Sequence, residues 1–194
     1  YKRQGINPDE LLLSEMLQSN SYKTGIFGKW HLGDAEKFMP TNHGFDEFYG
    51  ILFSNDMWPF HPERPQDYPN DLMLYKNDKP VQALIDQSDL TKNITDESIR
   101  FIEENKNNQF FLYIAHPQPH VPLFASKEFQ GSTGEGLFAD VISEIDFSVG
   151  RVIEALEKNN LSENTIVVFT SDNGPWLSYG DHAGSSGIFR EGKG

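Results

Sequence analysis

Residues 164 to 176 read Asn164-Thr-Ile-Val-Val-Phe-Thr-Ser-Asp-Asn-Gly-Pro-Trp176. Five residues of high β-propensity, Thr165 to Phe169, run directly into turn-forming residues, and this pattern predicts a buried strand of a parallel sheet. Asp172 and Asn173 would then lie at the carboxyl end of the strand, where open α/β sheets bind their ligands. Both side chains offer oxygen donors that suit a hard cation such as Ca²⁺ or Mg²⁺. The alternative is an ordinary turn, for which Ser-Asp-Asn-Gly is equally typical.

A second buried strand is predicted at residues 110–115, Phe-Phe-Leu-Tyr-Ile-Ala. It leads into a loop of two histidines and three prolines, His116-Pro-Gln-Pro-His-Val-Pro122. Proline fixes the backbone, which suits a rigid loop that orients a side chain. His116 and His120 are therefore candidate functional residues, the alternative being solvated loop histidines.

A third strand is predicted at residues 22–27, and it delivers the segment Gly28-Lys-Trp-His-Leu-Gly33. Lys29 and His31 are two residues apart, a spacing that places both side chains on one face of an extended segment. The two could form a functional pair, or they could be a surface lysine and a structural histidine.

The remaining chain alternates between helix and strand patterns. Apolar residues recur at helical spacing through residues 8–18, 91–104 and 136–159, and Asn7 is the expected N-cap of the first of these helices. Residues 72–81 suggest a hairpin, and residues 58–70 form a Pro-rich loop. This order predicts an α/β fold with a mostly parallel sheet flanked by helices. The length of 194 residues suits one domain, residues 1–194.

Composition narrows the possible functions. With 16 basic and 29 acidic side chains, the formal charge of −13 argues against a nucleic-acid or anionic-membrane surface. An anionic substrate would need a local cluster of Lys, His and backbone N–H groups. No apolar run approaches the length of a membrane span. The sequence contains no cysteine, which excludes disulfides and thiol chemistry within these residues.

Four stretches of the sequence together resemble the sulfatase family, and within it the arylsulfatase A type. They are Gly28-Lys-Trp-His-Leu-Gly33, Phe53-Ser-Asn-Asp56, His116-Pro-Gln-Pro-His-Val-Pro122 and Thr170-Ser-Asp-Asn-Gly-Pro175. Together with residues 44–50 and 192–194, they extend the resemblance over essentially the whole chain. It implies an alkaline-phosphatase-like α/β fold and hydrolysis of sulfate monoesters with a bound calcium ion.

The resemblance also implies binding roles for particular residues. Asp172 and Asn173 match calcium ligands of the family. Lys29 and Lys193 match contacts to sulfate oxygens, and Ser54 matches a residue that positions the sulfate or the active-site aldehyde.

Proton transfer is the role that the resemblance implies for His31 and His120. In the family, formylglycine attacks sulfur, and it is made from Cys or Ser in a Cys/Ser-x-Pro-x-Arg motif. His120, with Lys193 nearby, would protonate the leaving alcohol, and His31 would assist the release of sulfate. A divalent ion and two ammonium groups suit the charge on the sulfate oxygens.

Neither the formylglycine motif nor the Asp pair that completes the family's calcium site occurs in these residues. We therefore expect the chain to be an internal part of a sulfatase, incomplete at its N- and C-terminal ends. Taken alone, it should be catalytically silent and bind calcium weakly, because calcium needs roughly six to eight oxygens. Without the first strand of the sheet, an exposed edge or apolar patch would favour self-association.

Two other functions compete with this hypothesis. A phosphoester hydrolase of the same superfamily would usually hold two zinc ions, whereas Asn173 favours calcium. A non-catalytic module that binds calcium or sulfate would not need two proton-transfer groups. The expected substrate is a small-molecule or glycan sulfate ester, selected by residues 58–70 and 179–186. The resemblance implies a periplasmic, extracellular or lysosomal location.

Overall fold

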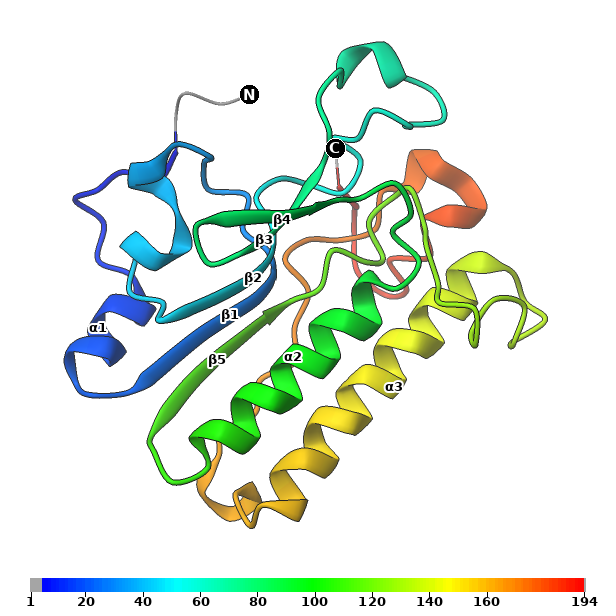
Figure 1. Ribbon diagram of the computed structural model, residues 1–194. Coiled ribbons are helices and arrows are strands. Elements are labelled where there is room, and N and C mark those ends of the chain that lie inside the picture. The colour runs from blue at the N-terminus through cyan, green and yellow to red at the C-terminus, as the bar shows by residue number, and fades with distance from the viewer. Residues whose placement is uncertain (1–4, 194) are drawn as a thin grey trace.

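A five-stranded sheet with strand order β4-β3-β2-β1-β5 forms the centre of the structure, a computed structural model that describes residues 5–193 (Figure 1). Strand β1 pairs in parallel with both β2 and β5, and the β3–β4 hairpin continues the sheet from β2 in antiparallel fashion. The expected α/β fold is confirmed. The strands are β1 (Lys23–Lys29), β2 (Glu47–Ile51), β3 (Met73–Lys76), β4 (Lys79–Ala83) and β5 (Phe110–Ala115).

Helices cover both faces of the sheet (Figure 1). Successive side chains of β1 point to opposite faces, so Ile26 packs with Phe48 on the side of α1 (Leu13–Ser19). On the other face, the Phe27 ring contacts Phe101 of α2 (Leu90–Asn105) edge to face, with 5.7 Å between centroids. The Phe27–Phe101 contact therefore helps to hold α2 on one face of β1, and the cluster of Ile26 and Phe48 forms the core on the other face.

The third helix, α3 (Leu137–Lys158), lies beside α2 (Figure 1). Arg151 of α3 pairs with Asp96 of α2, with 2.6 Å between nitrogen and oxygen. The hydroxyls of Thr95 and Ser148 share a buried hydrogen bond of 2.6 Å. Both long helices match their expected ranges within two residues, because each carries a continuous apolar stripe. None of the helices within residues 5–193 is long and apolar enough to span a membrane.

The first helix begins later than predicted. Asn7 accepts a hydrogen bond from the N–H of Asp9, so it stabilises a turn instead of a helix start. The helix starts at Leu13, and the Glu15 carboxylate accepts a bond of 2.8 Å from the N–H of Leu12. Asn7 has the side chain of a helix cap, but here that side chain accepts its hydrogen bond within a turn before the helix.

The prediction of a strand at residues 165–169 is wrong. The structure assigns this segment to no strand, and its side chains are exposed: 94% for Ile166, 53% for Val167, 78% for Val168 and 75% for Phe169. A strand needs a neighbour that pairs with its N–H and C=O groups, which β-propensity alone does not supply. Within the described residues, β1 already has two neighbours and β5 pairs only with β1. Consequently, Asp172 and Asn173 lie on an exposed loop and not at a strand end.

Candidate active site

Three parallel strands end at one edge of the sheet and bring distant parts of the chain together. Gly28 of β1 is aligned with Gly50 of β2 and Ala115 of β5. A Cβ atom on Gly28, whose φ is 126°, would lie 1.9 Å from the Ala115 carbonyl oxygen. Only glycine allows this close approach. The segments that follow the three strands therefore meet at the carboxyl edge of the sheet.

Lys29 is the last residue of β1 and is half-buried. Burial lowers its pKa below the usual value, while the Asp172 and Asp56 carboxylates raise it and the Lys193 ammonium lowers it further. The charge of Lys29 therefore interacts with three charged side chains from distant positions in the sequence at the carboxyl edge of the sheet.

His120 joins the same group of charges. Burial lowers the pKa of its imidazole, and so do Lys193 and Lys29, whereas Asp56 and a hydrogen bond to Val121 raise it. The Val121 carbonyl can only accept, so His120 Nδ1 carries the proton of their 2.6 Å bond. Nε2 is consequently the nitrogen that remains to exchange a proton with another group.

Asn55 fixes the loop that carries His120. Its buried side-chain amide donates to the carbonyl oxygens of His120 at 3.3 Å and Pro122 at 3.0 Å. The segment after β2 therefore orients the loop after β5 by direct hydrogen bonding.

Trp176 connects His120 with Lys193. Its ring centroid lies 5.9 Å from that of His120, and Lys193 Nζ lies 5.1 Å from the ring centroid. The backbone N–H of Lys193 donates to the Pro175 carbonyl at 2.9 Å. The segments around positions 175 and 193 are thus held together, which places the ammonium group against the aromatic face.

The other sequence-predicted residues lie close to this group along the chain. Ser54 is buried at 3% exposure, and within the described residues its hydroxyl has no hydrogen-bond partner. His31 is exposed, has a φ of 60°, and donates its backbone N–H to Leu52. The exposed Asn173 accepts a 2.7 Å bond from Ser171 at its carbonyl.

The structure separates the two histidines of the 116–122 loop. His116 faces the helices: its Nε2 lies 3.2 Å from the hydroxyl of Ser148 on α3. Burial lowers its pKa to about 4. His116 thus belongs to the buried contact between α2 and α3, and His120 belongs to the candidate site.

Sequence reasoning missed Asp56 and Trp176. Asp56 lies in the motif Phe53-Ser-Asn-Asp56, from which only Ser54 was selected, although its charge acts on both Lys29 and His120. An acidic residue in the short segment that follows a parallel strand was the available signal. Nothing in the local sequence pattern distinguished Trp176, because its role depends on contacts with residues 120 and 193.

The residues only partly fit a calcium ion. Asp172 and Asn173 supply oxygen donors of the right kind. Among residues 5–193, however, no group of three or more His, Asp or Glu side chains is placed to hold a metal ion. These two residues would therefore form one part of a coordination shell.

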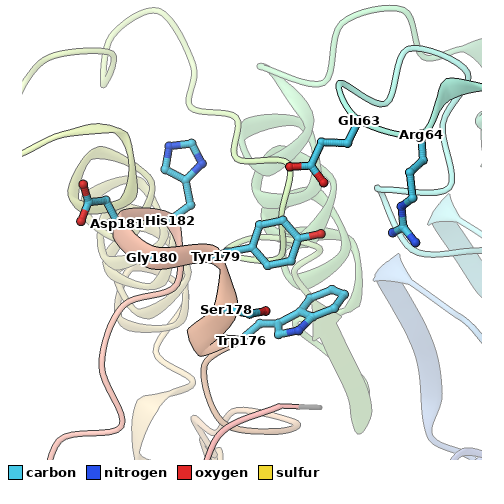
Figure 2. Close-up of a pocket in the computed structure, with 8 residues that line it drawn as sticks. All are labelled: Glu63, Arg64, Trp176, Ser178, Tyr179, Gly180, Asp181 and His182. Atoms are coloured by element: carbon cyan, nitrogen blue, oxygen red, sulfur yellow. The ribbon is translucent and has the colours of Figure 1, made fainter.

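A pocket of about 870 Å³ lies beside Trp176 (Figure 2). It is lined by Glu63 and Arg64 from one loop and by Trp176 and residues 178–182 from another, which contains the 3₁₀ segment Leu177–His182. It is a shallow depression that is largely open to solvent. The two loops overlap the segments 58–70 and 179–186, for which a role in substrate selection stays a prediction.

Comparisons with known proteins agree on one family. The family model described as Sulfatase matches residues 1–193. An arylsulfatase of Hemicentrotus pulcherrimus is 36% identical over 203 residues, which cover 100% of this chain and 37% of that protein. Human N-acetylgalactosamine-6-sulfatase is 36% identical, with 97% of this chain and 37% of that protein covered. Human arylsulfatase A is 33% identical, with 99% and 41% covered.

Solved structures show the same similarity. The crystal structure of Ps i-CgsB in complex with k-i-k-neocarrahexaose superposes with a TM-score of 0.75 at 32% identity, covering 92% of this chain and 43% of that one. The PsFucS1 sulfatase from Pseudoalteromonas sp. gives a TM-score of 0.81 at 25% identity, covering 93% and 41%. The chain thus spans about two fifths of the length of these relatives.

Proposed function

The chain belongs to the sulfatase family, and from this premise we propose that the full-length protein hydrolyses sulfate monoesters at the group of Lys29, His120 and Lys193. One observation carries the proposal. Three ionisable nitrogen groups, far apart in the sequence, act on one another at the carboxyl edge of the sheet. They form a local site for an anion in a chain whose formal charge is −13.

Lys29 and Lys193 would bind the sulfate group. Their ammonium groups can donate charge-assisted hydrogen bonds to its non-bridging oxygens. Partial burial strengthens such contacts, because the surrounding dielectric is lower than that of water. Ser54, whose buried hydroxyl lies on the adjoining segment, would help to orient the same oxygens.

His120 would protonate the leaving alcohol oxygen through Nε2. Its lowered pKa keeps the free imidazole mostly neutral near pH 7. A bound sulfate ester adds a negative charge, which raises the pKa and favours the imidazolium. Substrate binding would thereby charge the acid at the place where it is used.

We assign the remaining roles of the family to residues of this chain in the same way. His31 would act as a second proton-transfer group during the release of sulfate. Asp172 and Asn173 would contribute oxygens to a calcium ion, which would offset the charge on the sulfate oxygens when bound. A formylglycine group, which these residues do not encode, would supply the nucleophile.

Variants of the two lysines test this proposal. In the full-length protein, Lys29→Ala and Lys193→Ala should each lower kcat/KM for a sulfate monoester by about 10² to 10³. The exposed Lys158, at the end of α3, provides a matched control, and Lys158→Ala should leave kcat/KM unchanged. Equal effects of the site and control variants would contradict the assignment.

A further inference from the structure

The buried side chain of Gln87 lies just before α2, outside the stretches that make up the candidate site. Its Nε2 donates a 3.0 Å hydrogen bond to the backbone carbonyl of Asn55. The carbonyl of Gln87 accepts a bond of 3.0 Å from the N–H of Leu90, the first residue of α2. Because α2 packs on β1 through Phe101, Gln87 connects the segment after β2 with a rigid part of the fold.

Asn55 extends this connection to the loop that carries His120. Its side-chain amide, which is fully buried, donates to the backbone carbonyls of His120 and Pro122. The buried side chain of Gln118 donates to the same Pro122 carbonyl at 3.3 Å. Buried amides therefore fix the backbone on which the His120 imidazole is mounted, and Gln87 in turn holds one of these amides.

Two buried acceptors in this connection have no hydrogen-bond partner. Within residues 5–193, these are Oε1 of Gln87 and Oδ1 of Asn55. A buried acceptor without a partner costs free energy, so packing alone does not account for amides at these two positions. What the amides supply is directed N–H donors, one from Gln87 to Asn55 and two from Asn55 to the loop of His120. The pair therefore fixes geometry at some cost in stability.

We propose that Gln87 is a positioning residue for His120, the proton donor of the proposed function, and that it acts through Asn55. The proposal rests on that function for its chemical step. A general acid must lie within hydrogen-bond reach of the leaving oxygen, and a displacement of about 1 Å can cost about a hundredfold in rate. The bond from His120 Nδ1 to Val121 ties the imidazole to its own loop. Holding that loop therefore also sets the position of Nε2, which would deliver the proton.

Kinetics of the full-length protein test this role. Gln87→Met keeps the size of the side chain and removes both the donor and the unpaired Oε1, so the urea midpoint should change by less than about 0.5 M. For the sulfate ester of an aliphatic alcohol, kcat should fall about tenfold or more. For 4-nitrophenyl sulfate, whose leaving group needs little protonation, it should fall less than about threefold. Asn105→Leu removes another buried amide hydrogen bond of α2 and should leave both kcat values within about twofold.

A double-mutant cycle separates positioning from a structural role. In a His120→Ala background no acid remains to be positioned, so Gln87→Met should change kcat for the aliphatic ester by less than about twofold. A loss of stability cannot mimic this result, because it would be common to both backgrounds. A tenfold loss in both backgrounds, or no loss in either, would overturn the proposal.

Hydrogen exchange followed by mass spectrometry tests the connection without turnover. In the full-length protein, Gln87→Met should speed amide exchange in residues 118–124 about tenfold, whereas Asn105→Leu should leave it unchanged. Unchanged exchange of this loop in Gln87→Met would overturn the connection between Gln87 and His120. If the loop responds as predicted but the wild-type protein hydrolyses no sulfate ester, the proposed function fails and the connection stands.

Discussion

Acidification should destabilise the fold through His116. Its Nε2 contacts Ser148 within the α2–α3 layer, and burial lowers its pKa from 6.5 to about 4. The native state therefore keeps this imidazole neutral, while the unfolded chain takes up a proton at a higher pH. Its stabilising effect is complete above pH 6.5 and is lost as the pH falls towards 4.

The size of the effect follows from the two pKa values. A shift of one unit corresponds to about 1.4 kcal/mol, so the full loss below the native pKa is roughly 3 kcal/mol. Between about pH 7.5 and about pH 5, the free energy of unfolding should fall by about 2 kcal/mol from His116 alone. That loss is a large part of the stability of a typical domain.

Urea unfolding followed by tryptophan fluorescence at the two pH values would measure this loss. His116→Gln cannot titrate but can still hydrogen-bond to Ser148, so the other titrating groups cancel in the comparison. The wild-type protein should lose about 2 kcal/mol more than the variant on acidification. The same loss in both proteins would refute the role of His116.

Other predictions concern the site and the surface. Gly28→Ala should destabilise the fold by about 3 kcal/mol or more, measured by urea unfolding, because its Cβ would overlap the Ala115 carbonyl. His120→Ala should lower turnover by about 10² to 10⁴, less for nitrophenyl sulfate than for a sugar sulfate; an equal loss for both would remove His120 as the acid. Asp56→Asn removes a charge that raises the pKa of His120, so the pH above which kcat/KM declines should move lower. Phe169→Glu should reduce any self-association seen by sedimentation velocity, because Phe169 belongs to an exposed apolar strip.

The sequence predicted those elements whose signal is local. Helix α3 and strand β5 follow from continuous patterns of apolar residues, and both lie where expected. The strand at residues 165–169 failed because strand formation depends on a pairing partner, which propensity does not report. The start of α1 failed because Asn7 can stabilise a turn as well as a helix.

Some residues of the candidate site could likewise be predicted from local sequence, and others could not. Lys29 and His120 became candidates because they lie in segments that follow predicted strands, and the resemblance to the sulfatase motifs gave them their expected roles. Their interaction with Asp172 and Lys193 depends on the tertiary structure. From the sequence, it could be expected only because the motifs occur in the same order as in the family. Trp176 was missed because its relevance arises only from its contacts with His120 and Lys193.

Substrate choice is the most direct test of the central claim. The full-length protein would be assayed with 4-nitrophenyl sulfate and 4-nitrophenyl phosphate at equal concentrations, and the nitrophenol released would be measured. We predict that kcat/KM for the sulfate ester exceeds that for the phosphate ester by about 10² or more, and that Lys193→Ala abolishes this preference. A preference for the phosphate ester, or a sulfate-ester activity unaffected by Lys193→Ala, would contradict the account.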